Sequence, residues 1–319
     1  MLHLHNILAA IDFSDCSAEG LQLALRVAAK TGARVRVVFV QVLHADPFAP
    51  AVYPADHQQR VVGAMREVVT RAFDALGMDE TSVDVSYDVV HDSAVTPAIE
   101  RFARNYAIDL AVVGTHGRRG LRHMMLGSVA EELVRTLPCP VLTVRSDAAV
   151  HLLGGGDTPE LLVPVDFSSH SIEAVHAGRE FAALFSIGMR VLHVVEETLH
   201  PAFYNAGAFS IYDLQPDVEE RAWTHLQRML TETPGPVVPV ELEVVDGRAA
   251  AEIVRVARER GSSLIVMATH GLTGLAHLFM GSVTEKVVRL SPCPTLVVKS
   301  FGQSLFAPDH EDHFNAERA

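Results

Sequence analysis

The second half of this chain repeats motifs of the first half at one fixed spacing. Ile-Asp-Phe-Ser at 11–14 returns as Val-Asp-Phe-Ser at 165–168, and Pro-Cys-Pro at 138–140 returns at 292–294. Thr-His-Gly and Gly-Ser-Val likewise return, and every matched pair is 154 residues apart. Matches that share one spacing indicate a gene duplication, and hence two copies of one folding unit.

The length of the chain fits this interpretation. At roughly 150 residues per domain, 319 residues correspond to two domains, which we place at 1–146 and 161–300. We assign 147–160 to a linker, because Gly154, Gly155 and Gly156 stand there beside Asp157-Thr158-Pro159 and such clusters break regular structure. Residues 301–319 have no counterpart in the first half, and we expect a polar, acidic tail.

Short apolar runs alternate with helical patterns in both units. In the first unit we expect strands at 7–11, 35–42, 83–89, 110–114 and 141–145, with helices at 14–30, 56–76, 96–105 and 128–136. In the second we expect strands at 161–165, 191–195, 240–245, 264–268 and 295–299. This alternation predicts an α/β fold with doubly wound parallel sheets. Such sheets bind ligands at the carboxyl ends of the strands, where the strand order reverses.

Composition excludes several classes of protein. The net charge of -13 argues against a nucleic-acid partner, because such proteins usually carry a basic face. The three cysteines are odd in number and form no C-x-x-C pair, which argues against a disulfide framework or a zinc site. No apolar run reaches the ~20 residues that span a bilayer, and the N-terminus lacks the features of a signal peptide. We therefore expect a cytoplasmic protein without a membrane or nucleic-acid partner.

A glycine-rich motif follows the fourth expected strand of the first unit. It runs from Gly114 and Gly117 through nine residues to Gly127 and Ser128. Glycine lets a backbone approach a ligand closely, and the start of a helix favours phosphate. Arg118, Arg119 and Arg122 stand in the intervening loop and add positive charge. The alternative is purely structural, because residues 128–131 and 282–285 are both S-x-x-E capping boxes.

Polar residues at the same strand ends are further candidates. Asp12 and Asp166 follow the first strand of each unit, where they can contact ribose hydroxyls or a phosphate-bound Mg²⁺; the alternative is an Asx turn. His116 and His270 can contact phosphate or act as a base, although most loop histidines in a chain with 17 of them are structural. Neither a P-loop nor a G-x-G-x-x-G fingerprint is present, and we assign no catalytic residue or metal ligand.

Together these motifs resemble the universal stress protein family over roughly 5–146 and 160–300. The pattern G-x-x-G, nine residues, G-[ST] resembles the ATP-binding signature of that family, and the first unit fills it completely. The strand ending in Asp and the Pro-Cys-Pro before the last strand also resemble it. The resemblance implies a tandem-type member with two five-stranded parallel sheets of the adenine nucleotide alpha hydrolase-like type.

The resemblance also implies ATP or AMP as the ligand, with Mg as a further candidate. It places the first-strand Asp near the ribose and phosphates, and the backbone of the second strand against the adenine. The implied ligand-binding residues of the first unit are Ile11, Asp12, Val40, Val113, Gly114, His116, Gly117, Arg118, Gly127, Ser128 and Val129. Those of the second unit are Val165, Asp166, Val194, Met267, Ala268, His270, Gly271, Gly281, Ser282 and Val283.

The family further pairs its units through the last strand. We therefore expect 141–144 and 295–298 to pair within the chain, and two chains to form a homodimer.

The second unit departs from the family pattern. Ala268 replaces the first glycine, and residues 272–280 contain no Arg or Lys. A charge-assisted hydrogen bond contributes on the order of 1.5–3 kcal/mol, so we expect the first unit to bind ATP more strongly than the second.

Three functions remain open from the sequence. The first is a nucleotide-binding protein of stress response or signalling without efficient catalysis. The second is a slow Mg-dependent ATPase or nucleotide hydrolase that uses Asp12 and His116. The third is a structural interaction module with relic nucleotide sites.

Overall fold

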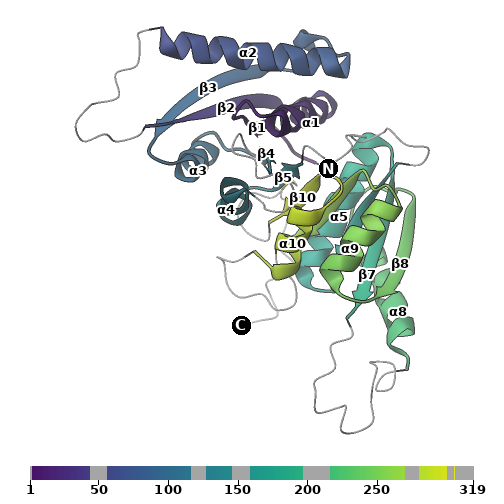
Figure 1. Cartoon of the computed structure of the whole chain (residues 1–319). Coiled ribbons are helices and arrows are strands. Elements are labelled where there is room, and N and C mark those ends of the chain that lie inside the picture. The colour runs from purple at the N-terminus through teal and green to yellow at the C-terminus, as the bar shows by residue number, and fades with distance from the viewer. Residues whose placement is uncertain are drawn as a thin grey trace, which may run out of the picture.

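The computed structural model describes residues 2–43, 56–115, 127–145, 159–196, 216–269, 280–299 and 305. Within them, each unit alternates strands and helices (Figure 1). Unit one, described within 2–145, contains β1 Asn6–Ala10, α1 Asp15–Thr31, β2 Arg34–Val42, α2 His57–Leu76, the 3-10 helix η1 Glu80–Ser82, β3 Val85–Asp92, α3 Val95–Asn105, β4 Leu110–Gly114, α4 Ser128–Thr136 and β5 Val141–Val144. Unit two, described within 159–299, contains β6 Glu160–Val165, α5 Ser169–Phe185, β7 Gly188–Val195, α8 Val218–Glu232, β8 Val240–Asp246, α9 Ala249–Glu259, β9 Leu264–Ala268, α10 Ser282–Leu290 and β10 Thr295–Val298.

The strands form one ten-stranded sheet in the order β3-β2-β1-β4-β5-β10-β9-β6-β7-β8. Within each unit, neighbouring strands are parallel, as the alternation of strands and helices predicts. The two five-stranded halves join where β5 pairs antiparallel with β10, with Val141 opposite Val297 and Thr143 opposite Thr295. The expected pairing of the last strands within the chain is therefore confirmed.

The antiparallel junction determines where the carboxyl ends of the strands lie. Since every strand is parallel to its neighbours within a unit, the carboxyl ends of unit one lie along one edge of the sheet. Those of unit two lie along the opposite edge, because β10 runs against β5. The two candidate ligand crevices are therefore at opposite edges of one continuous sheet.

Helices cover both faces of the sheet. One face carries α1, α2, α5 and α8 over a single apolar core that crosses the junction through β5 and β10. The other face carries α3 and α4 in unit one, and α9 and α10 in unit two. Figure 1 shows α1 and α2 on one side of the first strands and α3 and α4 on the other. Burial on both faces explains why the central strands are nearly continuous runs of apolar residues.

Most expected elements are present within a few residues, and three differences have a physical cause. β5 and β10 end one residue earlier than expected, at Val144 and Val298, because Arg145 and Lys299 leave the sheet and contact a helix. β7 begins at Gly188 rather than 191, since Arg190 is buried in the strand by ion pairs that an apolar pattern cannot reveal.

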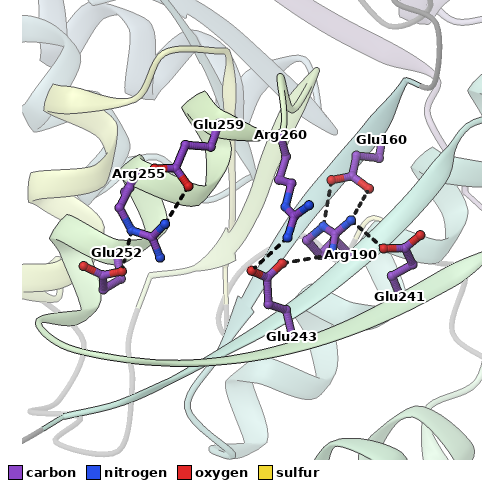
Figure 2. Close-up of polar contacts among 8 residues, drawn as sticks. All are labelled: Glu160, Arg190, Glu241, Glu243, Glu252, Arg255, Glu259 and Arg260. Carbon is purple, nitrogen blue, oxygen red and sulfur yellow. Dashed lines mark hydrogen bonds and ion pairs between the residues drawn. The ribbon is translucent and has the colours of Figure 1, made fainter.

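Arg190 is held by carboxylates from both neighbouring strands. Its guanidinium donates to Glu160 at 2.8 Å, to Glu241 at 2.5 Å and to Glu243 at 2.9 Å. The side chain of Arg190 is 8% exposed, and the Glu160 carboxylate is the main cause that raises the pKa of Arg190 above its usual value. Figure 2 shows Arg260 joining the same group through Glu243. The group therefore ties β6, β7, β8 and the end of α9 together.

Candidate functional site

The strand order reverses between β1 and β4 in unit one, and between β6 and β9 in unit two. Ala9 lies beside Val112 in the first pair, and Leu162 lies beside Ile265 in the second. In each unit one strand of the pair leads to the candidate Asp and the other to the glycine motif. The sheet therefore brings the two motifs together at its carboxyl edge, where a doubly wound sheet binds ligands.

Asp12 closes a tight turn at the start of α1. Its Oδ1 accepts hydrogen bonds from the Ser14 backbone N–H at 3.0 Å and the Ser14 hydroxyl at 2.5 Å. Asp166 repeats the turn in unit two, where its Oδ1 accepts from the Ser168 N–H at 3.1 Å and the Ser171 hydroxyl at 2.8 Å. The Asx turn that was the structural alternative is thus present in both units. The turn engages Oδ1 of each carboxylate and fixes the orientation of the side chain.

The residue after each Asp has a backbone conformation that large side chains rarely adopt. Phe13 has φ of 64° and Phe167 has φ of 63°, in the left-handed region where a bulky residue is an outlier. Such strain persists only where surrounding packing enforces it, and it concentrates at functional sites. Phe13 packs on Phe39, with ring centroids 5.0 Å apart. The same strained turn therefore follows the first strand in both units.

Helix α4 begins beside the carboxyl end of β4. Gly127 is its N-cap, and the Gly127 N–H donates to the Thr115 carbonyl at 2.8 Å. A Cβ on Gly127 would lie 2.9 Å from that carbonyl oxygen, so only glycine fits there. Gly281 and Thr269 form the equivalent 2.8 Å bond before α10. This contact holds the start of each helix against the strand end that faces the crevice.

The expected capping boxes are wrong. Ser128 and Ser282 are the first helical residues rather than N-caps, and neither helix has a side-chain cap. The reason is the glycine before each serine, which takes the extended N-cap conformation. Ser128 is exposed, and the first N–H groups of a helix have no acceptor within it. This leaves a hydroxyl and backbone donors together at the helix start.

Gly114 has a packing role that the sequence did not reveal. A Cβ at this position would lie 3.0 Å from the Cys16 sulfur and 3.2 Å from the Ser17 nitrogen. The added methyl would therefore meet the start of α1. Ala268 occupies the equivalent place in unit two and packs against the core. The Ala268 methyl is accommodated there, so the replacement of this glycine in unit two is compatible with the packing of the strand end.

Unit two has an imidazole where unit one has a phenyl ring. His193 takes the place of Phe39, and its Nδ1 lies 2.9 Å from the Val165 carbonyl. Its ring lies 4.2 Å from that of Phe167, and the His225 ring lies 5.4 Å from that of Phe167. Burial lowers the pKa of His193, while the Val165 carbonyl and Asp166 oppose that shift. The two crevices therefore differ in chemistry behind the shared turn.

The other candidate residues lie in different surroundings. Ile11, Val113, Val165 and Met267 are buried at the strand ends, Val40 and Val194 lie near the ends of β2 and β7, and Val129 is 39% exposed on α4. Val283 packs against the core of unit two. His116, Gly117, Arg118, His270 and Gly271 lie outside the described residues.

Comparison with known proteins decides the family. The model of the universal stress protein family matches this chain twice, at 3–145 and at 159–299. The chain belongs to the universal stress protein family. A universal stress protein of Mycobacterium bovis is 27% identical over 274 residues, which cover 83% of this chain and 88% of that protein. One from Methanocaldococcus jannaschii is 31% identical over 141 residues, which cover 44% of this chain and 81% of that protein.

Solved structures support the fold of this universal stress protein. A crystal structure of a universal stress protein from Archaeoglobus fulgidus superimposes with a TM-score of 0.60 at 20% identity, covering 92% of this chain and 98% of that one. A protein of unknown function from Pseudomonas aeruginosa gives 0.65 at 17% identity, covering 93% and 92%. Such distant likeness shows the tandem α/β fold and nothing about the ligand.

Sequence reasoning missed three pairs of residues that shape both sites. Thr115 and Thr269 are buried and hold the helix starts, as described above. The hydroxyls of Ser17 and Ser171 accept from the Asp12 and Asp166 backbone N–H groups at 3.3 and 3.1 Å. Phe13 and Phe167 carry the strained turn. The two members of each pair are 154 residues apart. The repeat itself was therefore the signal that could have found them.

Proposed function

We propose that this universal stress protein binds an adenine nucleotide in the crevice of unit one and acts in stress response or signalling without efficient turnover. The observation that carries the proposal is the start of α4. Exposed Ser128 and the first backbone N–H groups, which have no acceptor within the helix, stand there on a helix held by the Gly127–Thr115 hydrogen bond. The positive end of a helix dipole with free N–H groups favours phosphate. Asp12, across the reversal of strand order, faces the same edge and supplies an acceptor for ribose hydroxyls.

ATP is the expected ligand of unit one because its loop carries three arginines, whereas the matching loop of unit two has no Arg or Lys. Losing one charge-assisted contact costs on the order of 1.5–3 kcal/mol, which is roughly tenfold or more in affinity. Unit two then binds ATP weakly or prefers a ligand with fewer charges, such as AMP. A Mg²⁺ ion bound with the phosphates and a homodimer of chains complete the proposal.

The test uses the full chain. Native mass spectrometry of the protein as purified identifies a bound nucleotide, and calorimetry measures ATP and AMP binding. Asp166→Ala leaves the unit-one site alone, and Asp12→Ala leaves the unit-two site alone. We expect tight ATP binding only in the Asp166→Ala protein. Equal ATP affinity in the two variants would refute the asymmetry, and no nucleotide binding in either would refute the proposed function.

A turnover assay separates binding from catalysis. We expect ATP to remain intact over many times the residence time of the bound nucleotide. Hydrolysis that disappears in Asp12→Ala would replace the binding function with a slow ATPase. Absence of nucleotide binding in the natural protein and in both variants would instead favour a structural module with relic sites.

A further inference from the structure

The basic residue after the last strand of each unit contacts the last helix of the other unit. Lys299 follows β10, and its Nζ donates to the carbonyl of Val134 and, at 3.3 Å, to that of Arg135. Arg145 follows β5, and its Nη1 donates to the carbonyl of Arg289. Lys299 and Arg145 are equivalent in the repeat, as are Arg289 and Arg135. Each unit therefore makes the same contact with the last helix of the other unit.

The charges suit the place where these side chains end. The last carbonyls of an α-helix have no donor within the helix, and the dipole makes that end negative. A cation there satisfies both requirements. Lys299 is 5% exposed, and burial lowers its pKa to about 8. A buried cation of this kind is costly without partners, so its two carbonyl acceptors hold it in a defined place.

Hydrogen bonds continue from each basic residue to the candidate site of its own unit. The carbonyl of Val298, next to Lys299, accepts from the Thr269 N–H at 3.1 Å, and the Thr269 carbonyl accepts from the Gly281 N–H at 2.8 Å. In unit one the same path runs from Val144 to Thr115 at 2.8 Å and on to Gly127 at 2.8 Å. Each path ends at the first residues of α10 or α4.

Together, these hydrogen bonds and the helices α4 and α10 form a closed series of contacts around the junction of the two units. From Gly127, α4 runs about 11–12 Å, at roughly 1.5 Å per residue, to the carbonyls that Lys299 contacts. From Lys299 the path passes through Thr269 to Gly281, and then along α10 to Arg289 and Arg145. Arg145 follows Val144, whose carbonyl accepts from the Thr115 N–H, and the Thr115 carbonyl accepts from the Gly127 N–H. Because the candidate crevices lie at opposite edges of the sheet, α4 and α10 each extend from one crevice edge to the other.

We propose that Lys299 and Arg145 form a reciprocal clasp that couples the two candidate sites. Each unit holds the carboxyl end of the helix whose amino end borders the site of the other unit. The position of α4 at the unit-one site then depends on Lys299 of unit two, and the position of α10 on Arg145 of unit one. The identity of the ligand in this proposal rests on the proposed function, whereas the mechanical link between the helix ends does not.

Hydrogen exchange on the full, ligand-free chain tests the link itself. Lys299→Met keeps the length of the side chain and removes its donors, Lys299→Arg restores a donor, and Lys30→Met is a matched change at an exposed lysine in the last turn of α1. We expect Lys299→Met to speed exchange at Gly127 and Glu131 as well as in the last turn of α4. Lys299→Arg and Lys30→Met should leave these amides as in the natural protein. Faster exchange confined to residues 135–137 would overturn the clasp as a link.

ATP titration then tests the coupling at the site. In an Asp166→Ala background, where only unit one is available, we expect Lys299→Met to weaken ATP binding at least ~5-fold, the lower end of typical coupling between sites. Unchanged affinity in a folded Lys299→Met protein would overturn the coupling. If the parent protein itself binds no ATP, the proposed function fails, and hydrogen exchange alone decides whether the clasp exists. A role limited to stability would lower the melting temperature and leave both measurements unchanged.

Discussion

Gly127 lies so close to Thr115 that a Cβ on the glycine would stand 2.9 Å from the threonine carbonyl oxygen. That distance is shorter than normal contacts allow, and the same glycine donates to this oxygen at 2.8 Å. The contact joins the end of β4 to the start of α4, where the proposed phosphate site begins.

We expect Gly127→Ala to shift the start of α4 and to weaken ATP binding by tenfold or more, the cost of about one charge-assisted hydrogen bond. The control is Gly63→Ala in α2, where an added Cβ meets nothing within 4 Å. That change should stabilise the protein by about 0.4–1 kcal/mol through the unfolded chain. Calorimetry and thermal unfolding of both variants check this. Normal ATP affinity in Gly127→Ala would show that the helix start is not the phosphate site.

The Asp12 side chain accepts the hydrogen bonds of the turn and also carries a negative charge. Two substitutions can separate these roles. Asp12→Asn retains an oxygen that can accept from the Ser14 N–H and hydroxyl, so we expect a stable turn. Asp12→Ala removes it, and should lower the free energy of unfolding by about 1 kcal/mol, the typical net value of a hydrogen bond. If the carboxylate contacts ribose or a metal-bound phosphate, both variants bind ATP less well. A stable Asp12→Asn with full ATP affinity would reduce Asp12 to a turn residue.

The sequence predicted the fold well because the apolar runs and their order determine it. The repeat predicted both units, and the pairing of 141–144 with 295–298 followed from the family resemblance. What it did not predict depends on contacts between distant residues. Arg145 and Lys299 looked like strand ends until their acceptors on α10 and α4 were known. Gly114 looked like a ligand-facing glycine, although its closest neighbours are Cys16 and Ser17.

The candidate site was predicted in outline and not in its local geometry. Asp12 follows β1 and Gly127 is hydrogen-bonded to Thr115 at the end of β4, and these two strands are neighbours at the reversal of strand order. The capping box at Ser128 was wrong, because the pattern S-x-x-E cannot show that a preceding glycine takes the N-cap position. The left-handed conformation of Phe13 follows from packing that no local pattern records.

Substitution of Arg190 measures how much its buried ion pairs stabilise unit two. Arg190→Leu leaves the carboxylates of Glu160 and Glu243, which are 16% and 19% exposed, without their shared cation. Removing one partner of a buried pair costs about 3–5 kcal/mol, and we expect a loss of that order. Arg255→Leu is the control, because Arg255 is 44% exposed beside Glu252 and Glu259 and exposed pairs contribute about 0–1 kcal/mol. Equal losses in urea unfolding of the two variants would contradict this difference.

The pKa of Lys299 predicts a pH dependence of stability with a definite sign. Burial lowers it from 10.5 to about 8, so between these pH values the unfolded chain holds a proton that the folded chain has released. The free energy of unfolding therefore rises with pH in this window, by up to about 1.4 kcal/mol per pH unit. Below pH 8 the cost of burying the charge is fully present.

At higher pH, two buried thiols make the free energy of unfolding fall as the pH rises. Burial raises the pKa of Cys139 and of Cys293 from 9.0 to about 12, so the folded chain keeps protons that the unfolded chain loses above pH 9. Their contribution to stability falls as pH rises from 9 to 12. From pH 8 to 9 these thiols oppose Lys299 least, because the unfolded chain has released only part of their protons below pH 9.

Lys299→Met isolates the lysine from the thiols. We expect the natural protein to gain stability relative to Lys299→Met as the pH rises from 8 to 10.5, since methionine carries no proton to release and both proteins keep Cys139 and Cys293. Urea unfolding at half-unit steps of pH measures the difference between the two curves. Lys30→Met, at an exposed lysine, should run parallel to the natural protein. A Lys299→Met curve that is also parallel would mean that Lys299 titrates near its ordinary pKa, and that the clasp holds a lysine still in contact with water.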